Sequence, residues 1–389
     1  MSRAPLLVVA GEASGDRAAA AVLRHTQGAT FGFGGQALRA AGAELVGDLR
    51  HTTGMGLTLP LARAARLVRV FQRLVALARE RRPAVALLVN YTEFNLRLAR
   101  SLRPDLVHGH LVHGDVYGAV AAVASRATLV STKHNDDPFR AGPFRHVERL
   151  LARRTARIVC ITDALRRFSI DRVGLPADRL VVVHYGLDEP PAAWGDPGGP
   201  ALEPDVPVLV AVCRLEEQKG LDVAIRALAL LAGEHGLSAP HLVVLGEGTL
   251  RGRLESLARD EGVAERVHLP GRVGDVAWWV RRAAVLVHPA RWEGFGLALL
   301  EGMLCARPVV ASRVSSVPEI VEDGVTGLLV PPDDAIALGA ALARLLRAPE
   351  EAEAMGRAGY ERARTAFSVA AMADRTLAVY REALPSASS

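Results

Sequence analysis

Short apolar runs alternate with segments of helical periodicity along the chain of 389 residues. In the first half, apolar runs predict strands at residues 6–10, 84–89, 106–108, 128–131, 158–161 and 180–184. In the second half, they predict strands at residues 206–212, 241–245, 266–269, 285–288, 308–311 and 327–330. Between the runs, apolar residues recur every three or four positions, as in a helix with one buried face. Strands that alternate with helices indicate βαβ units, so we predict an α/β fold with two parallel sheets covered by helices.

A segment rich in proline and glycine separates the two halves. Residues 186–207 contain six prolines and four glycines, a composition that favours turns over regular packing. We therefore predict a linker at residues 186–206 between domains at residues 1–185 and 207–365. Residues 366–385 have a helical pattern and are predicted to form a C-terminal helix that packs back on the first domain.

The composition excludes several classes of protein. Half of the residues are apolar and 23% are charged, which is ordinary for a globular chain with sizeable cores. No eighteen apolar residues run together, and the apolar run near the N-terminus is too short for a secretory signal. The three cysteines lie far apart and without CxxC spacing, so neither a disulfide framework nor a zinc site is expected. We expect a cytoplasmic protein.

The basic residues carry a sharper signal. Only Lys133 and Lys219 are lysines among 47 basic residues, and all the others are arginines. A lysine ammonium is a compact point charge that suits a phosphate, whereas arginine is a planar fork. Both lysines are therefore candidates for function, with chance survival as the alternative for one of them. The net charge of +5 permits an anionic partner, but no nucleic acid is expected.

Two glycines and two glutamates follow the predicted strand that ends at His288. Glu293 opens the sequence Glu-Gly-Phe-Gly-Leu, and Glu301 lies eight residues further on. Glycines at a helix N-terminus let backbone N–H groups face an anion such as a phosphate. The two carboxylates would suit hydroxyl groups on either side of that phosphate. A glycine-containing turn followed by a solvated glutamate is the alternative.

Other loops support the first interpretation. Arg214 and Lys219 follow the predicted strand at residues 206–212, where both can neutralise a diphosphate. Further polar loops follow later strands at residues 246–248, 269–273, 316–319 and 323–327. In this order and spacing, the motifs from residue 207 to about residue 380 resemble the donor-binding domain of retaining glycosyltransferases of family 4. The resemblance implies the GT-B fold, in which two Rossmann-like domains face each other across a cleft.

The resemblance also implies roles for individual residues. Glu293 corresponds to the glutamate that contacts the transferred sugar, and Glu301 to the one that holds the ribose. Arg214 and Lys219 correspond to the residues that bind the diphosphate, and the main chain near Val273 would meet the base. Backbone groups at Gly294, Phe295, Gly296 and Leu297 would meet phosphate. One departure is Ser315-Ser316, where the family usually has two glycines.

Residues 104–137 resemble the acceptor-side βαβ unit of the same family. His134 then lies beside the donor sugar, and His110 is a candidate contact for the acceptor. His108, His110 and His113 form a cluster that suggests a metal, but no carboxylate triad accompanies it and the resemblance implies neither a metal nor a cofactor. The nucleotide-diphosphate sugar would be a co-substrate.

Residues 1–103 resemble the N-terminal region of lipid-A-disaccharide synthase, which also has the GT-B fold. The resemblance rests on residues 11–16, 31–48, 55–57 and 81–99. Asn90 and Glu93 stand where that family has acidic residues, so its catalytic assignment is not carried over. The GT-B fold points the turn at Gly11 toward the donor phosphates. A natural mosaic and a recombined gene both remain open.

Two further patterns have ordinary alternatives. Residues 32–37 match a GxGxxA dinucleotide fingerprint, but the preceding strand is short, so a structural turn is favoured over an NAD site. Residues 61–82 form a basic amphipathic pattern with Arg63, Arg66, Arg69 and Arg73 on one face. Such a helix can contact an anionic membrane on the inner face of the cell, although an ordinary helix packed on the core is slightly favoured.

Together these features predict a retaining glycosyltransferase that uses a nucleotide-diphosphate sugar. The acceptor would be a glycan, a lipid-linked molecule or a small molecule, in bacterial cell-envelope or polysaccharide synthesis. Two alternatives remain: a nucleotide-sugar epimerase on the same fold, and a non-catalytic mosaic that binds the donor.

Overall fold

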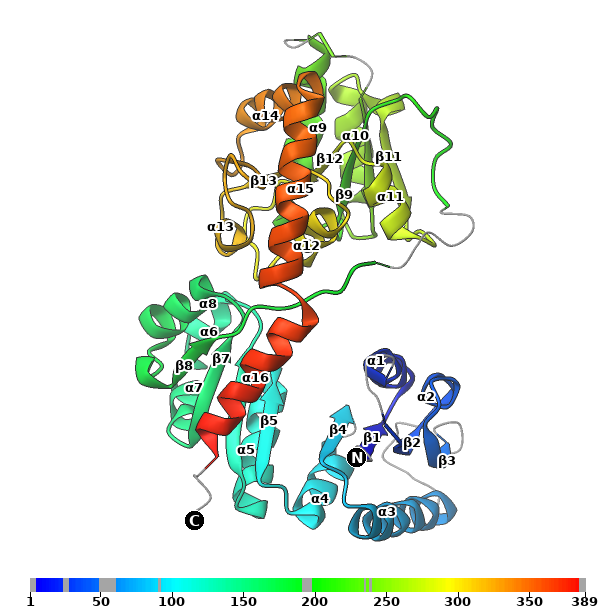
Figure 1. Ribbon diagram of the computed structural model, residues 1–389, viewed down its shortest axis with the longest axis vertical. Helices are drawn as coiled ribbons and strands as arrows, with labels where there is room; N and C mark the ends of the chain where they lie inside the picture. The colour runs from blue at the N-terminus through cyan, green and yellow to red at the C-terminus, as the bar shows by residue number, and fades with distance from the viewer. Residues whose placement is uncertain are drawn as a thin grey trace. The chain divides into compact units, whose positions relative to one another are not determined.

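The computed structural model describes residues 5–23, 28–48, 61–89, 92–190, 198–233, 236–237 and 240–384 (Figure 1). Parallel strands alternate with helices along these residues, which confirms the predicted α/β class. The chain divides into two compact units. The first contains residues 1–131, 154–156 and 384–389, and the second contains residues 132–153 and 157–383. The domain limits expected from the sequence remain a prediction.

The first unit contains a four-stranded sheet in the order β3-β2-β1-β4. Its strands are β1 (Leu6–Ala10), β2 (Thr30–Gly34), β3 (Glu44–Asp48) and β4 (Val85–Val89). Its helices are α1 (Ala13–Leu23), α2 (Gln36–Ala40), α3 (Leu61–Arg81) and α4 (Thr92–Leu102). Alternate residues of β1 enter different cores, with Leu7 and Val9 on one face and Val8 and Ala10 on the other. Both faces of the sheet are therefore covered, as a parallel sheet requires.

A second four-stranded sheet has the order β5-β6-β7-β8. Its strands are β5 (Leu106–His110), β6 (Thr128–Lys133), β7 (Thr155–Cys160) and β8 (Leu180–Val182). The helices between them are α5 (Leu111–Ser125), α6 (Pro138–Ala141), α7 (Arg145–Ala152) and α8 (Asp163–Phe168). Thr162 begins α8 by accepting a hydrogen bond from Leu165 N–H at 3.1 Å, so the loop after β7 leads directly into a capped helix.

The third sheet lies in the second unit and has six parallel strands in the order β11-β10-β9-β12-β13-β14. They are β9 (Val208–Val212), β10 (His241–Leu245), β11 (Val267–Gly271), β12 (Val285–His288), β13 (Val309–Ser312) and β14 (Gly327–Val330). The chain moves outward from β9 to β11 and then returns to place β12 on the other side of β9. The loops after β9 and β12 therefore diverge at the carboxyl edge of the sheet, where open α/β sheets bind ligands.

Helices cover both faces of the third sheet (Figure 1). They are α9 (Leu221–Gly233), α10 (Arg251–Asp260), α11 (Val276–Arg282), α12 (Leu297–Leu304), α13 (Val317–Ile320), α14 (Ala335–Arg347) and α15 (Pro349–Ala366). The chain ends in α16 (Val369–Ala383), in which Glu382 accepts a hydrogen bond from Arg157 of β7 at 3.4 Å. None of the helices described between residues 5 and 384 is both long and apolar enough to cross a bilayer.

The dinucleotide fingerprint at residues 32–37 has a structural explanation. Gly32 lies inside β2, and a Cβ atom there would approach the Val8 carbonyl oxygen of β1 to 1.7 Å. The carboxylate of Asp16 accepts hydrogen bonds from Gly35 N–H at 2.6 Å and Ala37 N–H at 2.8 Å. Because this carboxylate occupies the N-terminus of α2, a pyrophosphate would meet a negative charge there.

Candidate functional site

A pocket of about 760 Å³ lies in the second unit. Three loops supply most of its lining, each at the carboxyl end of a strand: residues 134–137 after β6, residues 214–219 after β9 and residues 292–298 after β12. The last two loops flank the point at which the third sheet reverses its strand order. The pocket therefore occupies the place at which this type of sheet binds ligands.

The structure brings most of the predicted donor-site residues together in this pocket. The lining includes His134, Arg214, Lys219, Glu293, Gly294, Phe295, Gly296 and Leu297. Glu301 and Val273, both among the described residues, do not belong to the lining. Gly11 and His110 belong to the first unit. The roles assigned to all of these residues remain predictions.

Glu293 is held as a carboxylate inside the pocket. Its side chain is 10% exposed and receives hydrogen bonds from Lys219 Nζ at 2.5 Å and His288 Nε2 at 2.9 Å. Burial alone would raise the pKa of Glu293, but the bonds and charges of His288 and Lys219 outweigh it and lower the pKa to about 2. Glu293 is thus ionised at every physiological pH, and it can accept hydrogen bonds from hydroxyl groups.

The loop that carries Lys219 is fixed by the loop that carries Glu293. Arg291 N–H donates to the Gln218 carbonyl at 2.8 Å, and Arg291 Nη1 donates to the Glu217 carbonyl at 2.7 Å. Arg291 Nη2 donates to both carboxylate oxygens of Asp222, at the start of α9, at 3.0 and 2.9 Å. Gly220 completes the turn at a φ of +58°, and a Cβ atom added there would lie only 2.0 Å from the Pro289 carbonyl oxygen.

The pocket lining also includes positive groups. Arg214 has an exposed side chain that makes no hydrogen bond or ion pair with any residue that the structure describes. Gly296 precedes α12 at a φ of +95°, a conformation that glycine adopts without strain. The first N–H groups of α12 have no partner within the helix and point toward its N-terminal end, which favours an anion. These groups suit a phosphate in the pocket.

His134 has a partner that the sequence analysis did not identify. Its Nδ1 atom contacts the hydroxyl of Tyr185, and the two rings lie 5.8 Å apart with planes 22° from parallel. Tyr185 also packs edge-on against Phe295 of the donor loop, at 5.0 Å between centroids. Burial raises the pKa of Tyr185 to about 12, so its hydroxyl stays protonated. In the sequence, the only indication of this contact was the neighbouring pair His184-Tyr185, which follows β8.

The two rare lysines differ in environment. Lys219 lines the pocket, whereas Lys133 is buried, with Glu148 at 3.5 Å. Glu148 also receives a forked contact from Arg140, at 2.6 and 2.8 Å, and Arg140 Nη1 donates to the Asn135 carbonyl at 2.5 Å. This buried cluster contacts the loop at residues 134–137 through Arg140 and the Asn135 carbonyl. Lys133 therefore belongs to a cluster that supports the pocket, but it does not line the pocket.

The lining also includes Asp136, Trp292 and Gln218, which the sequence analysis did not identify. Asp136 is a partly buried carboxylate in the pocket lining. Burial raises its pKa, and the charges of Asp137 and Glu293 add to the effect. Trp292 is 46% exposed, and Gln218 donates to its carbonyl at 2.9 Å. An acidic pair after a predicted strand and a tryptophan before Glu293 were the available signals.

The remaining predicted residues have different surroundings. Burial raises the pKa of Glu301 in α12, and Val273 packs against a hydrophobic core of the second unit. Gly11 N–H donates to the Val89 carbonyl at 3.2 Å. His110 ends β5 with a pKa that burial lowers despite the charge of Asp115. Across the described parts of the chain, no three histidine, cysteine or acidic side chains converge to hold a metal ion.

Comparison with known proteins agrees with this architecture. A sequence model described as Glycosyltransferase Family 4 matches residues 35–189, and one described as Glycosyl transferases group 1 matches residues 197–362. The D-inositol 3-phosphate glycosyltransferase of Frankia alni is 32% identical over 310 residues, which span 72% of this chain and 74% of that protein. The chain belongs to glycosyltransferase family 4. It is a glycosyltransferase with the two Rossmann-like domains expected from its sequence.

Other relatives differ in their names and in their coverage. This glycosyltransferase is 30% identical to the alpha-D-kanosaminyltransferase of Streptomyces kanamyceticus over 243 residues, 60% of this chain and 62% of that protein. It thus spans less than two thirds of that relative. Among solved structures, Anabaena HepE in complex with UDP and glucose has a TM-score of 0.68 at 19% identity, covering 97% of this chain and 99% of HepE. This likeness shows the GT-B fold.

The comparisons also bear on the first hundred residues. The family 4 match begins at residue 35, inside the segment that resembles the N-terminal region of lipid-A-disaccharide synthase. A sucrose-phosphate synthase from Thermosynechococcus elongatus covers 98% of this chain with a TM-score of 0.65 and 19% identity. The GT-B fold therefore includes the N-terminal segment.

Proposed function

We propose that this glycosyltransferase moves a sugar from a nucleotide-diphosphate donor to an acceptor hydroxyl, with retention of configuration at the anomeric carbon. One observation carries the proposal: a single pocket at the switch point of the third sheet holds Arg214, Lys219, the N-terminus of α12 and the ionised Glu293. The names of the relatives and the complex of HepE with UDP and glucose agree with this type of donor.

The charges in the pocket match the course of the reaction. Negative charge grows on the diphosphate as its bond to the sugar breaks, and Arg214, Lys219 and the amides of α12 would stabilise that charge. Lys219 can do so while it keeps its contact with Glu293, because an ammonium group has three donors. No metal ion is needed in this scheme, since the protein supplies the positive charge.

Glu293 and His134 would position the transferred sugar. The carboxylate of Glu293 accepts hydrogen bonds from sugar hydroxyls, and His134, held by Tyr185, lines another side. The resemblance to family 4 implies that the acceptor attacks from the side of the leaving group and that a donor phosphate oxygen takes its proton. The acceptor would be a glycan, a lipid-linked molecule or a small molecule.

Thermal unfolding with added nucleotides tests the donor class. A ligand at a hundredfold its dissociation constant stabilises a protein by about 2.7 kcal/mol. We expect one of UDP, GDP and ADP to raise the midpoint of unfolding, with or without EDTA, and the Glu301→Ala variant to lose the effect. A shift with NAD alone, or none with any nucleoside diphosphate, contradicts the proposal.

We also propose that helix α3 brings the protein to an anionic membrane surface through charge. Val70, Leu74 and Ala78 of α3 are buried in the first unit, whereas Arg66 and Arg73 are exposed. The contact would therefore be electrostatic, without insertion of the apolar face. Sedimentation with anionic vesicles at low salt tests it, and a protein that stays in the supernatant contradicts it.

A further inference from the structure

The segment Ser316–Glu319 lies outside the pocket lining but contacts two structures that shape the pocket. Ser316 is fully buried, and its Oγ atom lies 3.0 Å from the Glu293 carbonyl oxygen and 3.2 Å from the Phe295 carbonyl oxygen. A hydroxyl has one proton, so the two carbonyls share it. The serine hydroxyl thereby fixes the main chain on both sides of Gly294 in the donor loop.

A glycine at this position, as family 4 usually has, could not make that contact. Ser315 has a φ of +42°, and this left-handed turn directs the chain into α13. Val317 and Ile320 of α13 are buried in the core, so the helix is anchored next to the serine. The sequence therefore accepts a strained serine at 315 and gains a buried donor at 316.

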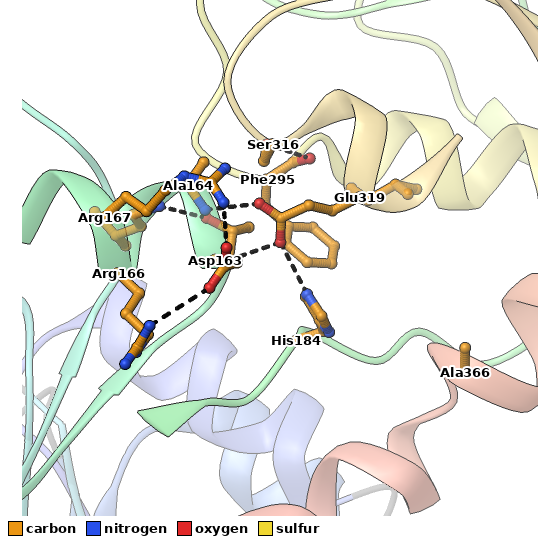
Figure 2. A network of polar contacts seen from close by, with 12 residues as sticks. Asp163, Ala164, Arg166, Arg167, His184, Phe295, Ser316, Glu319 and Ala366 are labelled. Atoms are coloured by element: carbon orange, nitrogen blue, oxygen red, sulfur yellow. Dashed lines mark hydrogen bonds and ion pairs between the residues drawn. The ribbon is translucent and has the colours of Figure 1, made fainter. Parts of the chain in front are cut away.

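Glu319, at the other end of α13, holds a second segment (Figure 2). Its carboxylate accepts hydrogen bonds from the backbone N–H groups of Asp163 and Ala164, each at 2.7 Å, and contacts His184 Nε2 at 3.1 Å. Burial opposes ionisation, but these bonds outweigh it, and the pKa of Glu319 lies below its ordinary value. A carboxylate at the first N–H groups of α8 is favoured for the same reason as any anion at a helix N-terminus.

The contact at His184 leads back to the pocket. Tyr185, the next residue, lines the pocket and contacts both His134 and Phe295. Helix α13 also contacts α15, because Arg362 of α15 donates hydrogen bonds to the carbonyls of Glu319 and Ile320 at 2.9 Å each. A four-residue helix thus connects the donor loop with the segment that orients His134.

We propose that Ser316 and Glu319 are positioning residues for sugar transfer: through α13 they hold the donor loop and the His184–Tyr185 segment in one geometry. This inference rests on the proposed function. Neither side chain lines the pocket, so both act through other residues, Ser316 through the main chain at 293–295 and Glu319 through His184.

The test measures the dissociation constant of the nucleoside diphosphate that stabilises the wild type, in Ser316→Ala, Glu319→Gln and the double variant. We expect Ser316→Ala to weaken binding about tenfold and Glu319→Gln about threefold. Because both act on one geometry, the double variant should lose less than the product of the two. Glu322→Gln, a neighbouring carboxylate near Arg362, is the matched control and should stay within twofold of the wild type.

Two further variants separate positioning from general stability. Ser316→Gly removes the hydroxyl without adding bulk and should weaken binding as Ser316→Ala does. His184→Gln keeps an N–H donor for Glu319 and should retain binding, whereas His184→Leu should resemble Glu319→Gln. Folded variants that melt at a lower temperature but bind as the wild type does overturn the inference. A wild type that binds no nucleoside diphosphate instead contradicts the proposed function itself.

Discussion

Glu293 combines burial with two positive partners, and this sets the reactivity expected of the pocket. An ionised carboxylate with a pKa of about 2 does not act as a proton donor near neutral pH. Such a carboxylate can accept hydrogen bonds from a substrate, and Glu293 already accepts one from Lys219. The same contact holds the ammonium group of Lys219 in the pocket that the N-terminus of α12 also lines.

The first prediction concerns these two residues. Lys219→Ala and Glu293→Gln should each lower the rate of transfer at least a hundredfold, since losing one contact to developing charge costs roughly 3–4 kcal/mol. Rates of donor hydrolysis and of transfer measure this, with circular dichroism to show that the variants fold. Glu255→Gln, an exposed carboxylate of α10, is the control and should keep the wild-type rate. Near-normal turnover in both pocket variants would refute the assignment.

Gly220 gives a second prediction at the scale of single residues. Gly220→Ala should destabilise the second unit by about 1–3 kcal/mol, because an added Cβ would overlap the Pro289 carbonyl at a positive φ. Urea unfolding measures the loss. Gly252→Ala is the matched control, since that position in α10 has open space and a glycine inside a helix is unfavourable. It should leave stability equal or higher, and equal losses in both variants would contradict the argument.

Helix α2 depends on a side chain from another helix. Asp16 is 4% exposed and accepts N–H groups at the start of α2, so it supplies the cap that the sequence before α2 lacks. Asp16→Ala should leave those donors unpaired and cost about 1–3 kcal/mol in the first unit. Hydrogen exchange of the α2 amides measures the loss, with the exposed Asp105→Asn as control. Unchanged exchange in α2 would show that the cap is dispensable.

Strands β10 and β11 are joined by a pair of histidines. His241 Nδ1 lies 2.8 Å from His268 Nε2, with ring planes 7° apart, so one proton is shared between them. Burial lowers the pKa of both histidines. At His241 the charge of Arg266 lowers the pKa further. At His268 the charge of His241 lowers it further, and the charge of Glu265 opposes this. If a second proton bound, both His241 Nδ1 and His268 Nε2 would carry a hydrogen, and the two N–H donors would repel each other.

This pair predicts a loss of stability in acid. Below about pH 6.5 both histidines bind protons in the unfolded chain, whereas in the folded protein their lowered pKa values keep them less protonated. The free energy of unfolding therefore falls as the pH falls. Above about pH 7.5 neither state is protonated, and the effect vanishes. Urea unfolding at pH 7.5 and 5.5 should show a smaller acid loss in His241→Gln/His268→Gln than in the wild type. An equal or larger loss in the double variant would contradict the prediction.

At the scale of the whole molecule, the sequence predicted the third sheet well and the first sheet poorly. All six strands of the third sheet lie where apolar runs were seen, because both faces of a parallel sheet are buried. Strands β2 and β3 contain glycines, which weaken their apolar pattern in the sequence. Only the structure shows that the absence of a side chain at Gly32 lets the backbone of β1 pack close to β2. The motif loops likewise predicted which segments line the pocket.

Contacts between distant segments could not be predicted in this way. Arg291 stands in an unremarkable position of the sequence. It acquires Asp222 as its partner only because β9 and β12 lie side by side in the third sheet. Lys133 shows the reverse case, because a rare residue type proved to be a buried ion-pair partner. Spacing along the chain identifies loops, whereas pairing within a pocket depends on the fold.

The arrangement of three loops around one pocket predicts how ligand binding is distributed over the molecule. The nucleoside diphosphate should slow hydrogen exchange together at residues 134–137, 214–219 and 292–298, since all three segments line the pocket. Lys219→Ala should remove the protection in all three, because the ammonium group links the loop after β9 to Glu293 and thence to the donor loop. Protection confined to one loop would mean that the three loops do not bind the ligand together. Protection centred on residues 32–37 would instead indicate a nucleotide site in the first unit.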